Sequence, residues 1–204
     1  MKTIIFDFDG TIADSFSLII EIARDLTKHP KLIDKKEIHT LKDLQLIDVA
    51  KELNIPKYKW PYLLFRGRKM MLARIDQIKP FDEINSLLKD LSNRKYSIYI
   101  MSSNSKKNIE IFLNKYNLKK YVHKIYGGVG LLNKAKNLNK IILKDNLNKS
   151  EVYYVGDEPR DIEASKKVNI KIISVSWGFN NKELLLKYNP DFIVDEPSSI
   201  LKIV

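Results

Sequence analysis

Residues 6–11 read FDFDGT and continue a short apolar run, TIIF, that is typical of a buried β-strand. Alternate residues of a strand point to the same face, so Asp7 and Asp9 are expected to face one crevice where the strand ends. Gly10 lets the backbone turn away sharply, and Thr11 adds a hydroxyl group. Two buried acids are costly without a cation or hydrogen bonds. The stretch is therefore either a polar strand end before a turn or the beginning of a cation site.

The composition is that of an ordinary soluble globular protein, with 44% hydrophobic and 30% charged residues. Its 204 residues suit one domain with a smaller insertion. No apolar stretch is long enough to cross a bilayer, and a strand begins too early for a signal peptide. Without cysteine there is no disulfide framework and no thiolate metal site. We therefore expect a cytoplasmic protein that is a monomer or a homodimer.

The net charge of +11 raises the question of nucleic-acid binding. The lysines are spread along the whole chain, with no block of five like charges and no aromatic–basic stacking module. The charge therefore favours attraction of a small anionic substrate over nucleic-acid binding as the main function.

The segment after FDFDGT is predicted to be helical. Apolar residues at helical spacing predict three helices, at about 15–29, 34–55 and 60–75. Either Ser15 or Ser17 can cap the first helix, and Asp34 with Glu37 resembles a capping box at the start of the second.

The third of these helices contains a weak point and a group of basic residues. Gly67 lowers its stability by roughly 1 kcal/mol relative to Ala. The basic residues are Arg66, Arg68, Lys69 and Arg74. They form either a solvated helix face or a contact with a second anionic group on a substrate, and the sequence leaves both open.

From residue 80 onward, predicted strands alternate with single helices. The strands are expected at 96–101, 122–126, 152–155, 171–175 and 192–194, with helices at 82–93, 105–117, 134–145, 160–168 and 181–188. This alternation indicates right-handed crossovers and a parallel sheet covered on both faces. We therefore expect an α/β, Rossmann-like core formed by residues 1–13 and 81–204, into which residues 14–80 insert a helical lobe.

Polar residues follow several of the predicted strands. SSNS at residues 102–105 can cap the next helix or hold an anion at its positive end. Lys134 begins a later helix, a position at which a lone lysine is usually solvated. Asp157, Glu158 and Asp161 follow another strand, and such crowded acids are unfavourable without a cation. Ligands bind at the carboxyl ends of parallel strands, and oxygen ligands suit Mg²⁺.

These motifs, in this order, resemble the haloacid dehalogenase superfamily. The resemblance is to its phosphoglycolate-phosphatase-like members, which have a helical cap after the first strand. The motifs are DFDGT at 7–11, Ser103-Asn104 after the second core strand, Lys134, and Gly156-Asp157 with Asp161. The resemblance covers essentially the whole chain and implies that residues 14–80 are the cap.

The resemblance implies a Mg²⁺-dependent phosphatase that acts on a small phosphorylated metabolite. Asp7 would attack phosphorus and form an aspartyl-phosphate. Asp9 would protonate the leaving oxygen and then activate water. Lys134 would offset the charge repulsion, and Lys136 competes with it for this role.

The resemblance also assigns residues to the metal and to the phosphoryl group. The implied metal ligands are Asp7, the backbone carbonyl of Asp9 and Asp157, with Glu158 and Asp161 acting directly or through water. The phosphoryl oxygens would be held by Ser103 and backbone amides near Asn104, next to Gly10 and Thr11. Ser102 competes with Ser103 for this contact.

Two other functions stay open at this point. One is a phosphomutase or phosphotransferase of the same family, in which a sugar hydroxyl replaces water as the acceptor. The other is a non-catalytic protein that binds an anion or nucleic acid. Metal-free dehalogenases lack an acid at the position of Asp9, so that residue favours phosphoryl chemistry.

Overall fold

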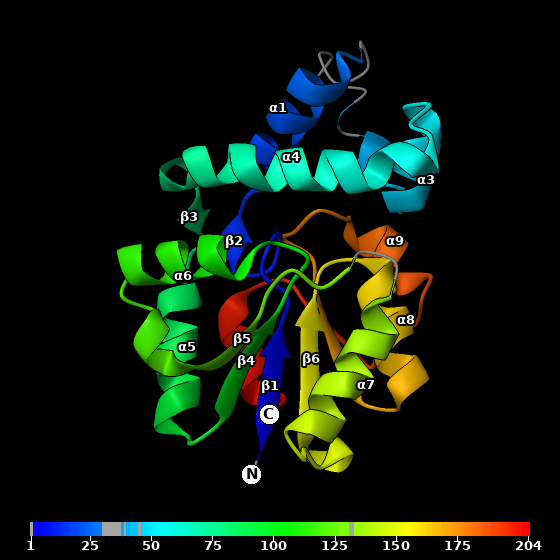
Figure 1. Cartoon of the computed structure of the whole chain (residues 1–204). Helices are drawn as coiled ribbons and strands as arrows, with labels where there is room; N and C mark the ends of the chain where they lie inside the picture. The colour runs from blue at the N-terminus through cyan, green and yellow to red at the C-terminus, as the bar shows by residue number, and fades with distance from the viewer. Residues whose placement is uncertain (1, 30–37, 39, 45, 131–132) are drawn as a thin grey trace.

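The computed structural model describes residues 2–29, 38, 40–44, 46–130 and 133–204 (Figure 1). Its central feature is a sheet of six parallel strands in the order β5-β4-β1-β6-β7-β8. The strands are β1 (Thr3–Phe6), β4 (Ser97–Met101), β5 (Val122–Tyr126), β6 (Val152–Gly156), β7 (Lys171–Val175) and β8 (Phe192–Val194). The predicted α/β fold with a parallel sheet is confirmed.

Strand β1 lies in the middle of the sheet, and its four residues are buried, as expected for a strand covered on both faces. Phe6 pairs with Ile100 of β4 on one side and with Val155 of β6 on the other. The next residue, Asp7, donates its backbone N–H to the carbonyl of Val155 at 2.8 Å. This pairing places Asp7 between the carboxyl ends of two neighbouring strands.

Helices cover both faces of the sheet. They are α5 (Ile84–Asn93), α6 (Lys106–Lys115), α7 (Lys134–Lys144), α8 (Pro159–Val168) and α9 (Lys182–Leu186). Leu88 of α5 and Phe112 of α6 join one buried cluster, whereas Leu138 of α7 and Ile162 of α8 join another (Figure 1). Alternate residues of β1 enter the two clusters, in keeping with the period of two in a strand.

Short 3₁₀ turns complete the described elements: η2 (Lys57–Lys59), η3 (Ile75–Gln77), η4 (Lys119–Tyr121), η5 (Lys149–Glu151) and η6 (Pro197–Lys202). Within the described ranges, every helix is too short or too polar to cross a membrane.

A two-stranded antiparallel ribbon joins the sheet layer to the helical segment above it. It consists of β2 (Ala13–Asp14) and β3 (Lys79–Pro80), in which Ala13 pairs with Pro80. The sequence did not predict these strands, because two residues are too few to show an alternating pattern. The ribbon brings the chain into and out of the helical segment side by side.

Helices α1 (Phe16–Thr27), α3 (Leu46–Glu52) and α4 (Trp60–Ala73) lie over the carboxyl end of the sheet (Figure 1). Helices α1 and α4 pack on one another, and Ile22 and Met71 extend the core cluster into this layer. The apolar stripe predicted for the first helix therefore faces inward in part, because Leu18 and Ile22 are buried.

The prediction of one continuous second helix is wrong, because residues 42–44 form a turn before α3. The buried Asn180 explains the break. Its side-chain amide donates to the backbone carbonyls of Lys42 and Leu44, both at 2.9 Å, so contact with the core interrupts the helix. The predicted capping box of Asp34 and Glu37 lies outside the described residues.

The predicted capping of α1 is also wrong. Ser15 occupies the N-cap position, but its hydroxyl makes no bond to the helix backbone. It donates instead to Oδ1 of Asp9 at 2.9 Å. Ser17 lies within the first turn of the helix. A charged acceptor makes a stronger hydrogen bond than a neutral backbone group, which explains why Ser15 contacts Asp9.

We expect Gly67→Ala to raise the free energy of unfolding by roughly 1 kcal/mol, because Gly is a poor residue inside a helix. A Cβ atom at Gly67 would meet only Cγ2 of Ile22, at an ordinary contact of 3.7 Å. Urea denaturation measures the change as a higher midpoint. Gly178→Ala is the matched contrast, since its Cβ would lie 2.3 Å from Cβ of Asp157 and must destabilise the fold. A lower midpoint for Gly67→Ala would contradict the assignment.

Candidate active site

The carboxylate of Asp7 is held from two sides at the end of β1. Oδ1 accepts the backbone N–H of Phe8 at 2.7 Å, and Oδ2 lies 2.6 Å from Nζ of Lys134. Both Asp7 and Lys134 are buried, so this ion pair is shielded from water. A buried carboxylate oriented in this way beside an ammonium group is suited to nucleophilic attack.

The side chain of Asp9 points to the same end of the sheet and is held by neutral partners. Oδ2 accepts the side-chain amide of Asn104 at 3.1 Å, and Oδ1 accepts the hydroxyl of Ser15. The pKa of Asp9 is raised to about 7, mainly by burial and also by the charge of Asp7, while the hydrogen bonds from Ser15 and Asn104 oppose the rise. A carboxyl group with this pKa can both donate and accept a proton near neutral pH.

The segment between β6 and α8 positions three further acids. Asp157 is completely buried, and its oxygens accept the Thr11 hydroxyl at 2.6 Å and the Phe179 backbone N–H at 2.8 Å. Glu158 and Asp161 form a reciprocal capping box at the start of α8. The capping box turns the carboxylate of Asp161 back toward the end of the sheet, where it pairs with Lys134.

Asp7, Asp157 and Asp161 form a buried cluster whose candidate ligand oxygens lie within 4.8 Å of one another. Burial raises the pKa of Asp157 well above its ordinary value, and the charges of Glu158, Asp7 and Asp161 raise it further. Burial likewise raises the pKa of Asp161 to about 6, against the opposing charge of Lys134. One ammonium group does not balance three carboxylates, so this set of oxygen donors fits a divalent cation.

Gly10 and Thr11 lie against the carboxylate of Asp157. Gly10 has a φ of +78°, and a Cβ atom there would lie 2.2 Å from Oδ2 of Asp157. Gly178 closes the other side, because its Cβ would lie 2.4 Å from the carbonyl oxygen of Gly10. Thr11 is fully buried, and its hydroxyl is used by Asp157. Gly10 and Thr11 therefore help to position Asp157, and their contact with substrate stays a prediction.

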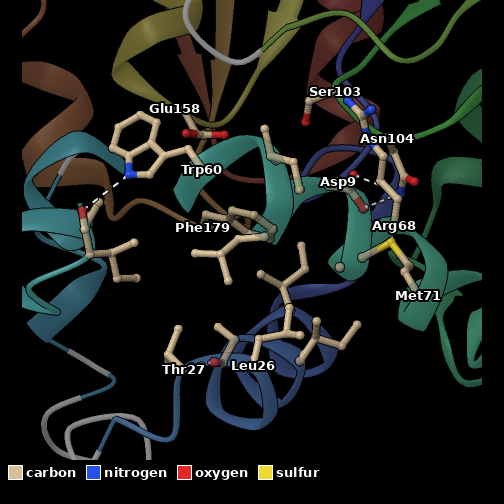
Figure 2. Close-up of a pocket in the computed structure, with 18 of the residues that line it drawn as sticks. Asp9, Leu26, Thr27, Trp60, Arg68, Met71, Ser103, Asn104, Glu158 and Phe179 are labelled. Carbon is tan, nitrogen blue, oxygen red and sulfur yellow. Dashed lines mark hydrogen bonds between the residues drawn. The ribbon is translucent and has the colours of Figure 1, made fainter. Parts of the chain in front are cut away.

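In the loop after β4, the two serines that could hold the phosphoryl group differ in their contacts. Ser102 is 1% exposed, and its hydroxyl accepts the backbone N–H of Asn104 at 3.0 Å. Ser103 lines the cavity above the acids (Figure 2). The next amide, that of Ser105, donates to Oδ1 of Asn104 at 2.8 Å. The backbone N–H of Asn104 therefore has a partner within the loop, whereas Ser103 lines the cavity; the contact of this loop with a phosphoryl group stays a prediction.

Lys134 and Lys136, the two lysines that could offset the charge of the site, also differ in their contacts. Lys134 is the first residue of α7, is 8% exposed, and forms ion pairs with Asp7 and Asp161. Although burial lowers the pKa of its ammonium group, the charges of Asp161 and Asp7 outweigh burial and raise it. Lys136 lies two residues further along the helix, so its side chain leaves on a different face.

A cavity of about 290 Å³ extends from these residues between α1 and α4 (Figure 2). Of the four basic residues on and after α4, Arg68 lines this cavity. Arg66 and Lys69 are exposed, and Arg74 pairs with Glu21 of α1. Contact with a second anionic group of a substrate therefore stays open for Arg68, because it faces the cavity and the other three residues do not. The structure adds Arg160 and Phe179 to the lining, neither of which the sequence singled out for this position.

Comparison with known proteins gives a consistent assignment. The family model of haloacid dehalogenase-like hydrolases matches residues 4–175. A phosphoglycolate phosphatase from Synechococcus elongatus is 31% identical over 100% of this chain and 97% of its own length. A pyrophosphatase, PpaX, from Listeria innocua is 24% identical over 100% of this chain and 96% of its own length.

Solved structures show the same fold. A haloacid dehalogenase-like hydrolase from Streptococcus pneumoniae has a TM-score of 0.80 at 23% identity and covers 100% of this chain and 98% of its own. A hydrolase from Pseudomonas syringae has a TM-score of 0.78 at 16% identity and covers 100% and 97%. The chain therefore belongs to the haloacid dehalogenase-like hydrolases, and it is an enzyme of the phosphatase kind.

Proposed function

We propose that the protein is a Mg²⁺-dependent phosphatase that hydrolyses a small phosphate monoester through an aspartyl-phosphate on Asp7. The observation that supports this most is the placement of the Asp7 carboxylate beside Lys134, in a buried acid cluster at the end of a cavity. The names of the two relatives supply 2-phosphoglycolate and pyrophosphate as the first substrates to test.

Asp7, Asp157 and the backbone carbonyl of Asp9 would hold the Mg²⁺. Asp161 supports them from behind, because its oxygens already contact Lys134 and the Glu158 N–H. When bound, the ion neutralises the acids and draws negative charge from the phosphoryl oxygens. The crowding of three buried carboxylates around one ammonium group supports this part of the proposal.

In the first step, the Asp7 carboxylate attacks phosphorus and the bond from phosphorus to the leaving oxygen breaks. Asp9 gives its proton to that oxygen, which departs as an alcohol. Lys134 lies 2.6 Å from Asp7 and reduces the repulsion between the carboxylate and the approaching phosphate. The hydroxyl of Ser103 is available to a phosphoryl oxygen, since it lines the cavity.

In the second step, water attacks the phosphorus of the aspartyl-phosphate. Asp9, now a carboxylate, takes the proton of that water, and the Asp7 carboxylate leaves. The pKa of about 7 is suited to both steps, because the group changes role between donor and acceptor within one turnover.

We also propose that residues 14–80 act as a cap over a core of residues 1–13 and 81–204. The side-chain amide of Asn108 on α6 donates to the carbonyl of Arg68 on α4 at 3.1 Å, which ties the two parts together above the acids. A cap in this position excludes water and selects the leaving group.

Addition of Mg²⁺ to the metal-free protein is expected to raise the melting temperature and to start the release of inorganic phosphate from 2-phosphoglycolate or another ester of a metabolite panel. At about 100 times the Kd, binding stabilises the fold by roughly 2.7 kcal/mol. EDTA should reverse both effects, and Asp157→Asn should weaken both. Full turnover in EDTA would contradict the metal-dependent reaction.

The same panel of metabolite esters distinguishes the phosphatase from the two other functions that the sequence left open. An isomerised sugar phosphate without free phosphate would indicate a mutase. Retardation of DNA at moderate salt without any turnover would indicate a non-catalytic binding protein.

A further inference from the structure

We propose that the preferred substrate is a phosphate monoester whose leaving group carries an apolar chain or ring, which lies between α1 and α4. This inference rests on the proposed phosphatase function and names its substrate class. It separates the protein from enzymes that act on small, fully anionic phosphates, because most of the described residues of α1 and α4 that line the cavity are apolar.

The walls of the cavity are the first observation. Ile22 and Leu26 of α1 line the cavity together with Leu63 and Leu64 of α4 and with Phe179 from the loop after β7. Figure 2 shows Leu26 and Phe179 among the side chains that surround it. The cavity of about 290 Å³ is near the lower end of the sizes that hold drug-like ligands. It is therefore larger than phosphate needs and is lined for apolar contact.

The second observation is that two described polar side chains at the far end of the cavity, those of Trp60 and Thr27, already have hydrogen-bond partners. Nε1 of Trp60 donates to the carbonyl of Ile55 at 3.4 Å, and the hydroxyl of Thr27 donates to the carbonyl of Ala23 at 2.7 Å. A carboxylate or a row of sugar hydroxyls placed there would lose water without gaining partners, which is unfavourable.

The third observation is the position of the charges. Asp9, Ser103, Asn104 and Arg68 gather on one side of the cavity in Figure 2, Trp60 lies on the opposite side, and Glu158 lies between the two sides, beside Trp60 in this view. A phosphate at the acids therefore has the charged residues around it, and the rest of the ester extends toward the apolar walls.

Gly67 is the residue of α4 at which a larger side chain tests the proposal. It lines the cavity from α4, and a Cβ atom there would meet only Ile22 of α1, at 3.7 Å. A glycine inside a helix is unfavourable for the helix, yet here it leaves open the space between α1 and α4. A larger side chain at Gly67 would project into the space assigned to the apolar group.

The test is a series of phosphate monoesters of methanol, butan-1-ol, hexan-1-ol and benzyl alcohol, compared with 2-phosphoglycolate and pyrophosphate. Each buried methylene should raise kcat/KM by about two- to fourfold until the cavity is filled. Hexyl and benzyl phosphate should therefore exceed both anionic substrates by at least about tenfold. Hexan-1-ol should inhibit the hydrolysis of methyl phosphate competitively.

Three variants connect the result to the cavity. Gly67→Leu should lower the ratio of kcat/KM for hexyl phosphate over methyl phosphate by about tenfold and weaken inhibition by hexan-1-ol. Gly67→Ala tests helix stiffening without filling the space, and it should change that ratio by less than about twofold. Lys69→Leu places the same leucine at an exposed position of α4 and should leave the ratio unchanged. Circular dichroism checks that each variant is folded.

The outcomes separate the two proposals. A flat series, or 2-phosphoglycolate or pyrophosphate as the best substrate, would overturn the apolar substrate class and leave the phosphatase standing. An equal ratio in wild type and folded Gly67→Leu would also overturn it. Release of no phosphate from any ester with Mg²⁺ present would overturn the proposed function itself.

Discussion

The Asp7→Asn variant is expected to fold and to lose turnover by about 10⁴-fold or more, the scale of loss when an essential nucleophile is removed. The amide is nearly isosteric with the carboxylate, and its oxygen can still accept the N–H of Phe8. It cannot form an acyl-phosphate, because the neutral amide is a very weak nucleophile. The measurement is phosphate release under saturating substrate and Mg²⁺.

A direct readout accompanies this prediction. Borohydride should trap the aspartyl-phosphate of the wild type during turnover, and mass spectrometry should place the modified residue at position 7. The control is Asp14→Asn, because Asp14 is an exposed acid on β2, and that variant should keep wild-type turnover. Wild-type activity in Asp7→Asn, or a trapped residue elsewhere, would show that the nucleophile is assigned to the wrong side chain.

The Lys134→Met variant is expected to lose both activity and stability. Its ammonium group forms ion pairs with the buried Asp7 and Asp161, so its removal leaves two acids without their cation. Breaking a buried ion pair from one side costs about 3–5 kcal/mol of folding free energy. Loss of one preorganised charge next to the reacting phosphate lowers kcat by about 10²- to 10³-fold.

Urea denaturation of the metal-free protein and steady-state kinetics measure the two effects. Lys136→Met is the matched control, since it makes the same change on another face of α7. It should alter neither the midpoint nor kcat appreciably. Mg²⁺ should restore part of the lost stability of Lys134→Met, because a divalent cation offsets the same acids. Equal behaviour of the two variants would remove Lys134 from the site.

Much of the acid cluster could be predicted from short-range rules. Asp7 and Asp157 follow β1 and β6, and the carboxyl ends of neighbouring parallel strands meet at one edge. Asp161 lies one helical turn into α8, where a capping box turns it back to the same edge. These positions depend on the local order of strand, turn and helix, which hydrophobic patterns reveal.

The errors came from polar contacts that the local helix patterns do not include. Ser15 has a typical N-cap position, but the buried Asp9 is a better acceptor for its hydroxyl. The helix predicted through residues 42–44 is interrupted because Asn180 binds its carbonyls. In both cases a polar side chain binds a partner that the patterns of helix capping and helix periodicity do not include.

By itself, the sequence determined the α/β fold, the edge of the sheet that carries the site and the acids gathered there, because strand and helix periods decide which residues share a face. Only the tertiary structure decided between equivalent candidates, such as Lys134 over Lys136 and Arg68 over Arg66. It also decided that the cavity above the acids is apolar. The physical reason is that neighbouring positions on a helix differ by about 100° of rotation. Which of them meets the site is decided by how that helix packs on the rest of the chain.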